Sequence, residues 1–414
     1  MAYPVKWMHS GMQGAPVLSN QWGDLVALLD ACLMSGFNSQ TSSGITVAAG
    51  VATASFGSGA HGFVPYQVIE VSGASGLDGQ HRVTAVTSTT VSFAAPAGAA
   101  SYSGACVVKA AAVGGWSKPF SATNKGAYKS THPTSSGCYL RVDNSLDANY
   151  TTTFAKYAKV TLCEGMTGMD SMSGARVPYN PASPTLNEGS SGTGGTVVNG
   201  WFKWLQAWAS QASSEGDGGA GARGWLLVGD SRTFYLLINP RLGLDGLCGY
   251  SFGDYQSYAA ADPLNALLVA HDHGVAANNS GQLYYYSYQN QFAQTEYNVG
   301  RGLPVGLDQA HLPFAFMSLN ATTGGNNYAS GENGGIAWPN PANYSVELAP
   351  VYLLDNNKSL RGKLRGLLFM PHTACTVPHL SVLEQDGGIY LFASLLNNNN
   401  ASLARAAFDL TDWG

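Results

Sequence analysis

Two short patterns in the chain contain the residue types of nucleophilic catalysis. Gly229, Asp230 and Ser231 follow an apolar run, and Asp308 lies downstream, three positions before His311. A serine becomes a nucleophile when a histidine takes its proton and a carboxylate orients that histidine. The two patterns occur in the order that this chemistry uses. Ser231, Asp308 and His311 are therefore one candidate catalytic set.

The residues around the serine argue against catalysis. The two patterns resemble those of GDS-type esterases, in which a helix follows the serine and its N-terminus helps to stabilise the oxyanion. Here residues 233–238 have the composition of a strand, and Arg232 stands where that family has an apolar residue. We predict a hairpin turn and no enzyme activity. The esterase is kept as a remote alternative.

Five residues have the side chains and spacing of a weak zinc site. These candidate ligands are His271, His273, His372, Cys375 and His379. Imidazole and thiolate groups at such short spacing can share one ion. However, Pro371 and Pro378 bracket the second group, and no Cys-x-x-Cys pair is present. We expect loops with partly exposed histidines, and neither a metal nor a cofactor.

The chain carries few charges and many glycines. Charged residues make up 11% of the sequence, against roughly 25% in typical globular proteins. Such a composition suits β-sheets with tight turns, and it suits subunits whose surfaces are covered by neighbours, because interface cores are depleted of charge. A secreted β-protein with a neutral surface fits equally well. The net charge of −5, without a basic stripe, excludes nucleic acid as a partner.

The chain lacks the patterns of membrane insertion and secretion. No apolar run reaches the length of a bilayer span, and the first residues lack the regions of a secretory signal. We therefore expect a protein made and kept in a cytoplasm, at least initially. Its six scattered cysteines are then buried thiols.

The N-terminal third predicts a helix and a small β module. Residues 1–18 are expected to be irregular, and residues 21–35 have the apolar spacing of a helix, capped by Ser19 or Asn20 and ended by Gly36. Residues 44–109 contain short β-branched and aromatic runs cut by Gly, Asp and Pro, which indicate a small all-β module, barrel-like or immunoglobulin-like. This predicts three regions, namely residues 1–43, 44–109 and 110–414.

The remaining region, residues 110–414, is predicted to be a larger β-sandwich region, which makes the chain mainly β. Residues 225–239 give the strongest hairpin signal, and residues 358–365 indicate a strand with its charges toward solvent. Trp201, Trp204, Leu205 and Trp208 have helical spacing and predict a short amphipathic helix. Residues 182–200 and 212–224 are expected to be long exposed loops.

Several segments resemble a family of virion structural proteins of tailed bacteriophages and prophages. They are YPVKWMHSGMQGAPVL at residues 3–18, LLDACL at 28–33, GWSKPFSATNK at 115–125, YLRVD at 139–143, and residues 225–237. The family offers no catalytic motif to transfer. The resemblance implies a virion protein of the tail or baseplate, assembled in the host cytoplasm, whose partners are its own copies and other virion proteins.

Two alternatives remain within the same biology. One is a capsid decoration or head–tail connector protein. The other is a receptor-binding tail protein that contacts host surface glycans through aromatic side chains of the C-terminal half, such as those at residues 284–297.

The module lies between two resembling segments, which indicates an insertion. We expect a chain without residues 44–95 still to fold. Residues 1–18 and the loops at 182–200 and 212–224 are expected to act as arms that become ordered only in the particle.

Overall fold

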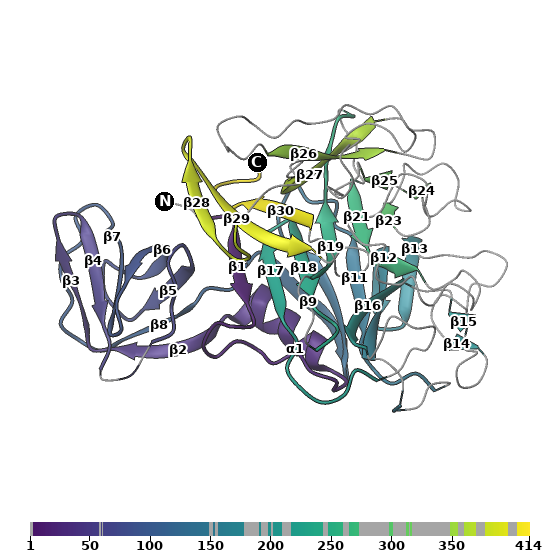
Figure 1. The fold of residues 1–414 in the computed structure, drawn as a ribbon, viewed down its shortest axis with the longest axis horizontal. Coiled ribbons are helices and arrows are strands. Elements are labelled where there is room, and N and C mark those ends of the chain that lie inside the picture. Colours follow the sequence, from purple (N-terminus) through teal and green to yellow (C-terminus); the bar gives the residue numbers. More distant parts are fainter. Residues whose placement is uncertain are drawn as a thin grey trace.

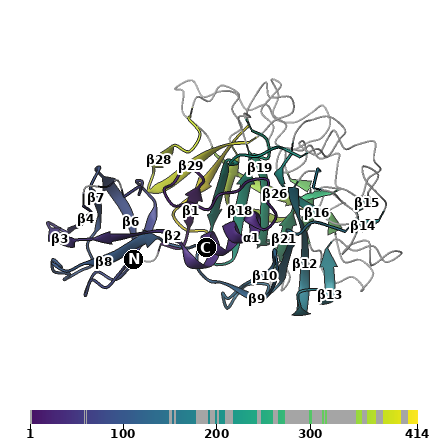
Figure 2. The ribbon, with the colours of Figure 1, turned by 90° about the horizontal axis from the view of Figure 1, so that it is seen from below.

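The structure is a computed structural model. It describes residues 3–57, 59, 61–148, 152–153, 156–177, 190–191, 198–199, 202–208, 217–242, 247–259, 265–272, 298–300, 312–313, 315–316, 348–354, 360–369, 377–395 and 404–414. The fold is mainly β, with several sheets, one of them nearly closed into a barrel, as predicted. Figures 1 and 2 show the small barrel-like unit at one end of the molecule in both views.

The barrel-like unit, here called the module, spans residues 37–110. Its strands are β2 (Phe37–Ser42), β3 (Gly44–Ala48), β4 (Val51–Ser55), β5 (Val68–Ser72), β6 (Gly79–Val86), β7 (Thr90–Ala94) and β8 (Cys106–Ala110), in the order β2-β8-β5-β6-β7-β4-β3. A bridge between Ile45 and Tyr102 nearly closes the sheet. The module begins at Phe37, before the predicted boundary at residue 44, because β2 pairs with β8.

The rest of the described chain, here called the body, is built around a central sheet. Its strands are β1 (Lys6–His9), β17 (Trp225–Gly229), β18 (Thr233–Ile238), β19 (Cys248–Asp254), β21 (Ala266–Val269), β23 (Asn298–Gly300) and β24 (Leu312–Pro313), in that order. The predicted hairpin at residues 225–239 is confirmed as β17 and β18. Every residue of both strands is buried, which explains why their sequence is continuously apolar.

A second sheet, here called the outer sheet, contributes the next layer. Its strands are β9 (Trp116–Ala122), β10 (Lys125–Ser130), β11 (Tyr139–Asp143), β12 (Lys156–Gly168), β16 (Phe202–Ala207) and β22 (His271–Asp272), in the order β22-β16-β12-β11-β10-β9, with β13 (Ser171–Val177) paired to β12. A separate pair joins β14 (Ser190–Ser191) to β15 (Val198–Asn199).

A third sheet, here called the C-terminal sheet, completes the body. Its strands are β20 (Gln256–Ser257), β25 (Ala315–Phe316), β26 (Ala349–Leu354), β27 (Leu360–Phe369), β28 (Val382–Gln385), β29 (Gly388–Leu395) and β30 (Ala404–Asp409), in the order β25-β26-β27-β30-β29-β28, with β20 paired to β27.

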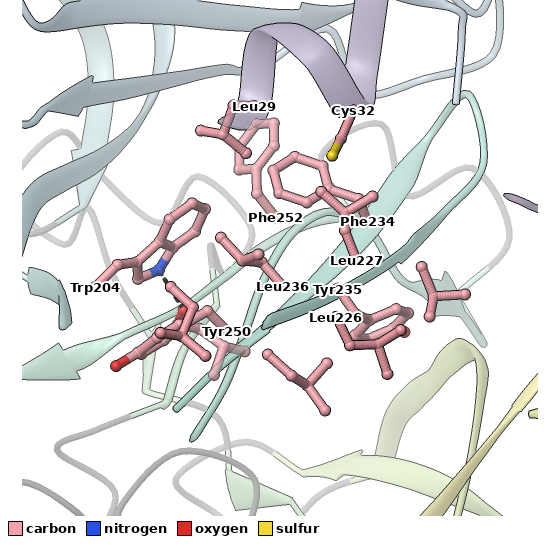
Figure 3. Close-up of a cluster of buried hydrophobic side chains, with 14 of the residues drawn as sticks. Leu29, Cys32, Trp204, Leu226, Leu227, Phe234, Tyr235, Leu236, Tyr250 and Phe252 are labelled. Carbon is pink, nitrogen blue, oxygen red and sulfur yellow. Dashed lines mark hydrogen bonds between the residues drawn. The ribbon is translucent and has the colours of Figure 1, made fainter. Parts of the chain in front are cut away.

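The central sheet packs between the other two sheets. On β18, Phe234 meets Trp116 of β9 and Trp204 of β16, with ring centroids 5.2 and 6.1 Å apart. The next residue, Tyr235, points to the opposite face and meets Phe408 of β30 at 5.4 Å. Successive side chains of a strand alternate between faces, so one strand serves two hydrophobic layers. Figure 3 shows Phe234 and Phe252 beside Leu29 and Cys32, with Trp204 stacked on Tyr250.

The predicted helix forms, but it begins later than expected. It consists of α1 (Asp24–Asp30) followed by the π-helical turn η1 (Ala31–Ser35), and Gly36 ends it with a φ of 70°. Gly23 adopts a left-handed φ of 94°, so the helix cannot extend toward residue 21. The cap is supplied by Asn144, whose Oδ1 accepts hydrogen bonds from the Gly23 and Leu25 N–H groups at 2.8 and 3.2 Å.

Two other predictions about local structure were wrong, the first of them only in part. Residues 10–18 are irregular as predicted, but residues 6–9 form β1, which pairs with β17. Residues 3–18 are also not an exposed arm, because Trp7 and Met8 are buried and the Trp225 Nε1 donates to the Pro16 carbonyl at 3.0 Å. Residues 202–207 form strand β16 rather than a helix, and neighbouring Trp204 and Leu205 are both buried. A strand buried on both faces has no apolar–polar alternation by which it could be recognised. The spacing of the tryptophans therefore wrongly indicated a helix. Trp201 lies outside the described residues.

The predicted loops lie partly within the described chain. Residues 217–224 form no strand or helix, but buried Arg223 donates to the carbonyls of Gly218, Gly219 and Gly221 and so anchors this segment. Residues 212–216, and all of 182–200 except β14 and β15, lie outside the described residues. Five of the predicted buried thiols are confirmed, whereas Cys375 also lies outside the described residues.

Excision of the module is expected to leave the body folded. Phe37 and Ala110 are register partners in β2 and β8, and Gly36 touches the chain where it returns at Ala110. Removing residues 37–110 therefore leaves Gly36 and Ala111 as neighbouring ends, which a short Gly-Ser linker can join. The module also has a hydrophobic core separate from that of the body. Near-ultraviolet circular dichroism and cooperative thermal unfolding of the excised chain would check this. A molten, non-cooperative product would show that the body depends on the module.

Candidate functional site

The Gly-Asp-Ser turn is the one sequence-predicted catalytic element whose side chains the structure describes. It joins β17 to β18, the second and third strands of the central sheet. Asp230 is 5% exposed, and its Oδ1 accepts hydrogen bonds from the N–H groups of Arg232 and Thr233, each at 2.8 Å. Its Oδ2 pairs with Nη2 of Arg365 on β27 at 2.8 Å. The carboxylate therefore shapes the turn and ties it to the C-terminal sheet.

The contacts of Ser231 in this turn hold the chain in place. Its carbonyl accepts a hydrogen bond from Ser130 Oγ at 2.6 Å, and Gly115 lies so close that a Cβ there would be 2.4 Å from the Ser231 Cβ. The residues after it form strand β18, so no helix N-terminus is available to an oxyanion at this turn. Asp308 and His311 lie outside the described residues.

A second buried carboxylate braces the same turn. Asp254 is 2% exposed, and its Oδ2 accepts a hydrogen bond from Arg232 Nε at 3.1 Å. Its backbone carbonyl accepts from Thr233 Oγ1 at 2.6 Å. We call Asp230, Arg232, Asp254 and Arg365 the turn brace. The strand at residues 358–365 was predicted with all its charges toward solvent. That was wrong for Arg365, which is buried because it pairs with Asp230.

Lys6 lies close to the turn brace. Its Nζ donates to the Val113 carbonyl at 2.7 Å. Burial lowers the pKa of Lys6 to about 8, an effect that the charges of Asp230 and Glu70 oppose. The ammonium therefore links the N-terminal strand to the segment that leaves the module.

The outer sheet contains a charge cluster that the sequence did not reveal. Lys125, Asp143 and Lys159 are register partners across β10, β11 and β12. Asp143 Oδ2 lies 3.2 Å from Lys125 Nζ, and 3.3 Å from both Lys159 Nζ and Arg141 Nη2. Opposite charges directly across a sheet stabilise the strand pairing. The one available signal was the alternation at residues 139–143, which puts Arg141 and Asp143 on one face.

The cations set the protonation of this cluster. Burial by itself would raise the pKa of Asp143, but Lys159, the Ser145 hydroxyl, Arg141 and Lys125 outweigh it and lower the pKa to about 2. Lys159 also pairs with Asp147 at 3.0 Å, and Arg141 with Asp170. The cluster is thus a paired network within the protein.

The five zinc candidates are only partly covered by the structure. The His379 Nδ1 accepts a hydrogen bond from the Ser394 N–H at 3.1 Å, and His271 lies on β22. His273, His372 and Cys375 lie outside the described residues. Within the part of the chain that the structure describes, no cluster of three or more His, Cys, Asp or Glu side chains could hold a metal ion.

No family model and no curated protein matches the chain. The described helical residues include no segment with the length and apolar character that crossing a membrane requires.

Replacing Ser231 by alanine is expected to change neither ester hydrolysis nor stability. The hydrogen bond given for Ser231 uses its backbone carbonyl, which alanine keeps. Hydrolysis of p-nitrophenyl acetate by both proteins, with chemical unfolding as the folding control, checks this. A loss of hydrolysis in a folded Ser231→Ala protein would restore the esterase alternative.

Proposed function

We propose that the chain is a structural subunit of a tailed-bacteriophage particle, located in the tail or baseplate. It acts through repeated contacts with its own copies and with other virion proteins. On this proposal it is not an enzyme, and its place of action is the assembled virion.

One observation carries the proposal: segments that resemble the virion family, though far apart in sequence, meet in the body. Residues 3–18 supply β1, which pairs with β17 of residues 225–237. Residues 115–125 supply Trp116, whose Nε1 donates to the Asp230 carbonyl at 2.8 Å. A resemblance scattered by chance would have no reason to collect around one hairpin. The contacts instead support a shared structural core.

The distribution of charge gives a second line of support. The module contains four charged side chains, those of Glu70, Asp78, Arg82 and Lys109. Glu70 pairs with Lys109 at 3.5 Å, Asp78 accepts from the Ala74 N–H at 2.7 Å, and Arg82 donates to the body. The charges are thus engaged inside the chain, and apolar side chains such as Val51, 43% exposed, face outward. Interface cores are depleted of charge, so this surface suits contact with a neighbouring subunit.

The proposal is tested first by composition. Particles purified through a density gradient from cells that express the phage or prophage are digested and sequenced by mass spectrometry. Peptides of this chain at a stoichiometry comparable to known tail proteins are expected. The absence of these peptides from intact particles would contradict the proposal. Binding of the isolated protein to host cells or to host glycans would favour the receptor-binding alternative.

A further inference from the structure

We propose that the module is a hinged unit, held against the body by a clamp centred on Arg82 and free to pivot when that clamp opens. The inference rests on contacts between module and body, and it holds whether or not the chain belongs to a phage particle.

The hinge lies where the chain crosses between two separate hydrophobic cores. One core belongs to the body and the other to the module. The chain leaves the body at Gly36, whose φ is 70°, and returns after Ala110. A Cβ at Gly36 would lie 2.2 Å from the Ala110 carbonyl oxygen, so the outgoing and returning segments touch. Two adjacent crossings define an axis about which one unit can turn.

The centre of the clamp is an arginine on β6. Arg82 Nη2 donates to the Leu410 carbonyl, just after β30, and its guanidinium lies 5.2 Å from the centroid of the Tyr3 ring. Arg82 therefore joins the module to both the first and the last segments of the body. A guanidinium can donate in several directions and stack on an aromatic ring at the same time, which a lysine ammonium cannot reproduce.

Polar contacts near Arg82 complete the clamp. The Tyr66 carbonyl accepts from Trp7 Nε1 at 3.2 Å, and the Tyr66 hydroxyl lies near Glu384 on β28. Partly exposed Phe37 and Val64 add apolar contact with the body core. Gln67 Nε2 also donates to Met12 Sδ at 3.3 Å. Interfaces between domains allow relative motion unless they are large and hydrophobic, and this one combines polar contacts with a few apolar ones.

The test measures the distance between module and body by pulsed electron paramagnetic resonance. Spin labels are placed at Val51→Cys in the module and Val17→Cys in the body, where the native side chains are 43% and 65% exposed. The background carries Cys375→Ser, because the other five cysteines are buried. The parent protein is expected to give one narrow distance distribution, and Arg82→Ala is expected to lose it and give a broad one.

Two further variants make the result decisive. Gln80→Ala, an exposed change on the same strand, should keep the narrow distribution. Arg82→Lys keeps the positive charge but loses the planar guanidinium, and it should also broaden the distance distribution. It is the substitute variant if the Arg82→Ala protein does not fold. A narrow distribution in the folded Arg82 variants, or a broad one in the parent, would overturn the clamp.

Discussion

The free energy of unfolding of an Asp230→Ala protein is expected to be about 3–5 kcal/mol lower than that of the parent. Losses of this size are found when one partner of a buried ion pair is removed. The change leaves Arg365, 5% exposed, without the carboxylate that it pairs with at 2.8 Å. It also removes the acceptor for the Arg232 and Thr233 N–H groups. Urea denaturation followed by tryptophan fluorescence measures the loss.

Two variants separate the parts of this effect. Asp230→Asn keeps an oxygen for the turn but removes the charge, so its stability should lie between those of the parent and Asp230→Ala. Ser231→Ala, on the neighbouring residue, should stay within about 0.5 kcal/mol of the parent. If Asp230→Ala were as stable as Ser231→Ala, the turn brace would have no structural role.

Acid is expected to weaken the fold through Asp143. Its pKa is lowered from 3.8 to about 2 in the folded protein, so the folded state binds this proton less readily than the unfolded chain does. The resulting stabilisation is present above pH 3.8 and is lost as the pH falls through about 2. A depression of this size corresponds to about 2 kcal/mol.

The Asp143 prediction is checked by measuring the free energy of unfolding from neutral pH to pH 2 for the parent and for Asp143→Asn. The variant should be less stable at neutral pH, and the difference between the proteins should shrink across the acid window. Asp386→Asn, an exposed change in the turn between β28 and β29, is the control and should follow the parent. A constant difference at all pH values would show that Asp143 is not the acid-sensitive group.

Sequence patterns predicted those elements whose signal is local. The β17–β18 hairpin is two apolar runs around a Gly-Asp-Ser turn, and the helix ends at a glycine. The start of the helix was missed because its cap, Asn144, is supplied by a distant part of the chain. Strand β1 was missed because its four residues are too few to show the alternation of a strand. It forms by pairing with β17.

The position of the Gly-Asp-Ser turn was predicted from the sequence, but the interactions of its side chains were not. Asp230 and Ser231 lie in a turn as expected, yet Arg365, which decides what Asp230 does, is 135 residues away in the sequence. Residue spacing contains no information about such a pair. The Asp143 cluster likewise depends on the register of β10, β11 and β12, which is fixed only when the sheet assembles.

The central claim, that the chain is a subunit of the tail or baseplate, is tested most directly by immunogold electron microscopy of intact particles. Antibodies raised against the purified module and against the excised body are used separately, so that a buried epitope on one unit does not hide the protein. Our account predicts gold at the tail or baseplate for at least one antibody. Gold confined to the head would contradict that location and favour a capsid decoration or connector protein, and unlabelled particles with both antibodies would contradict a place in the virion.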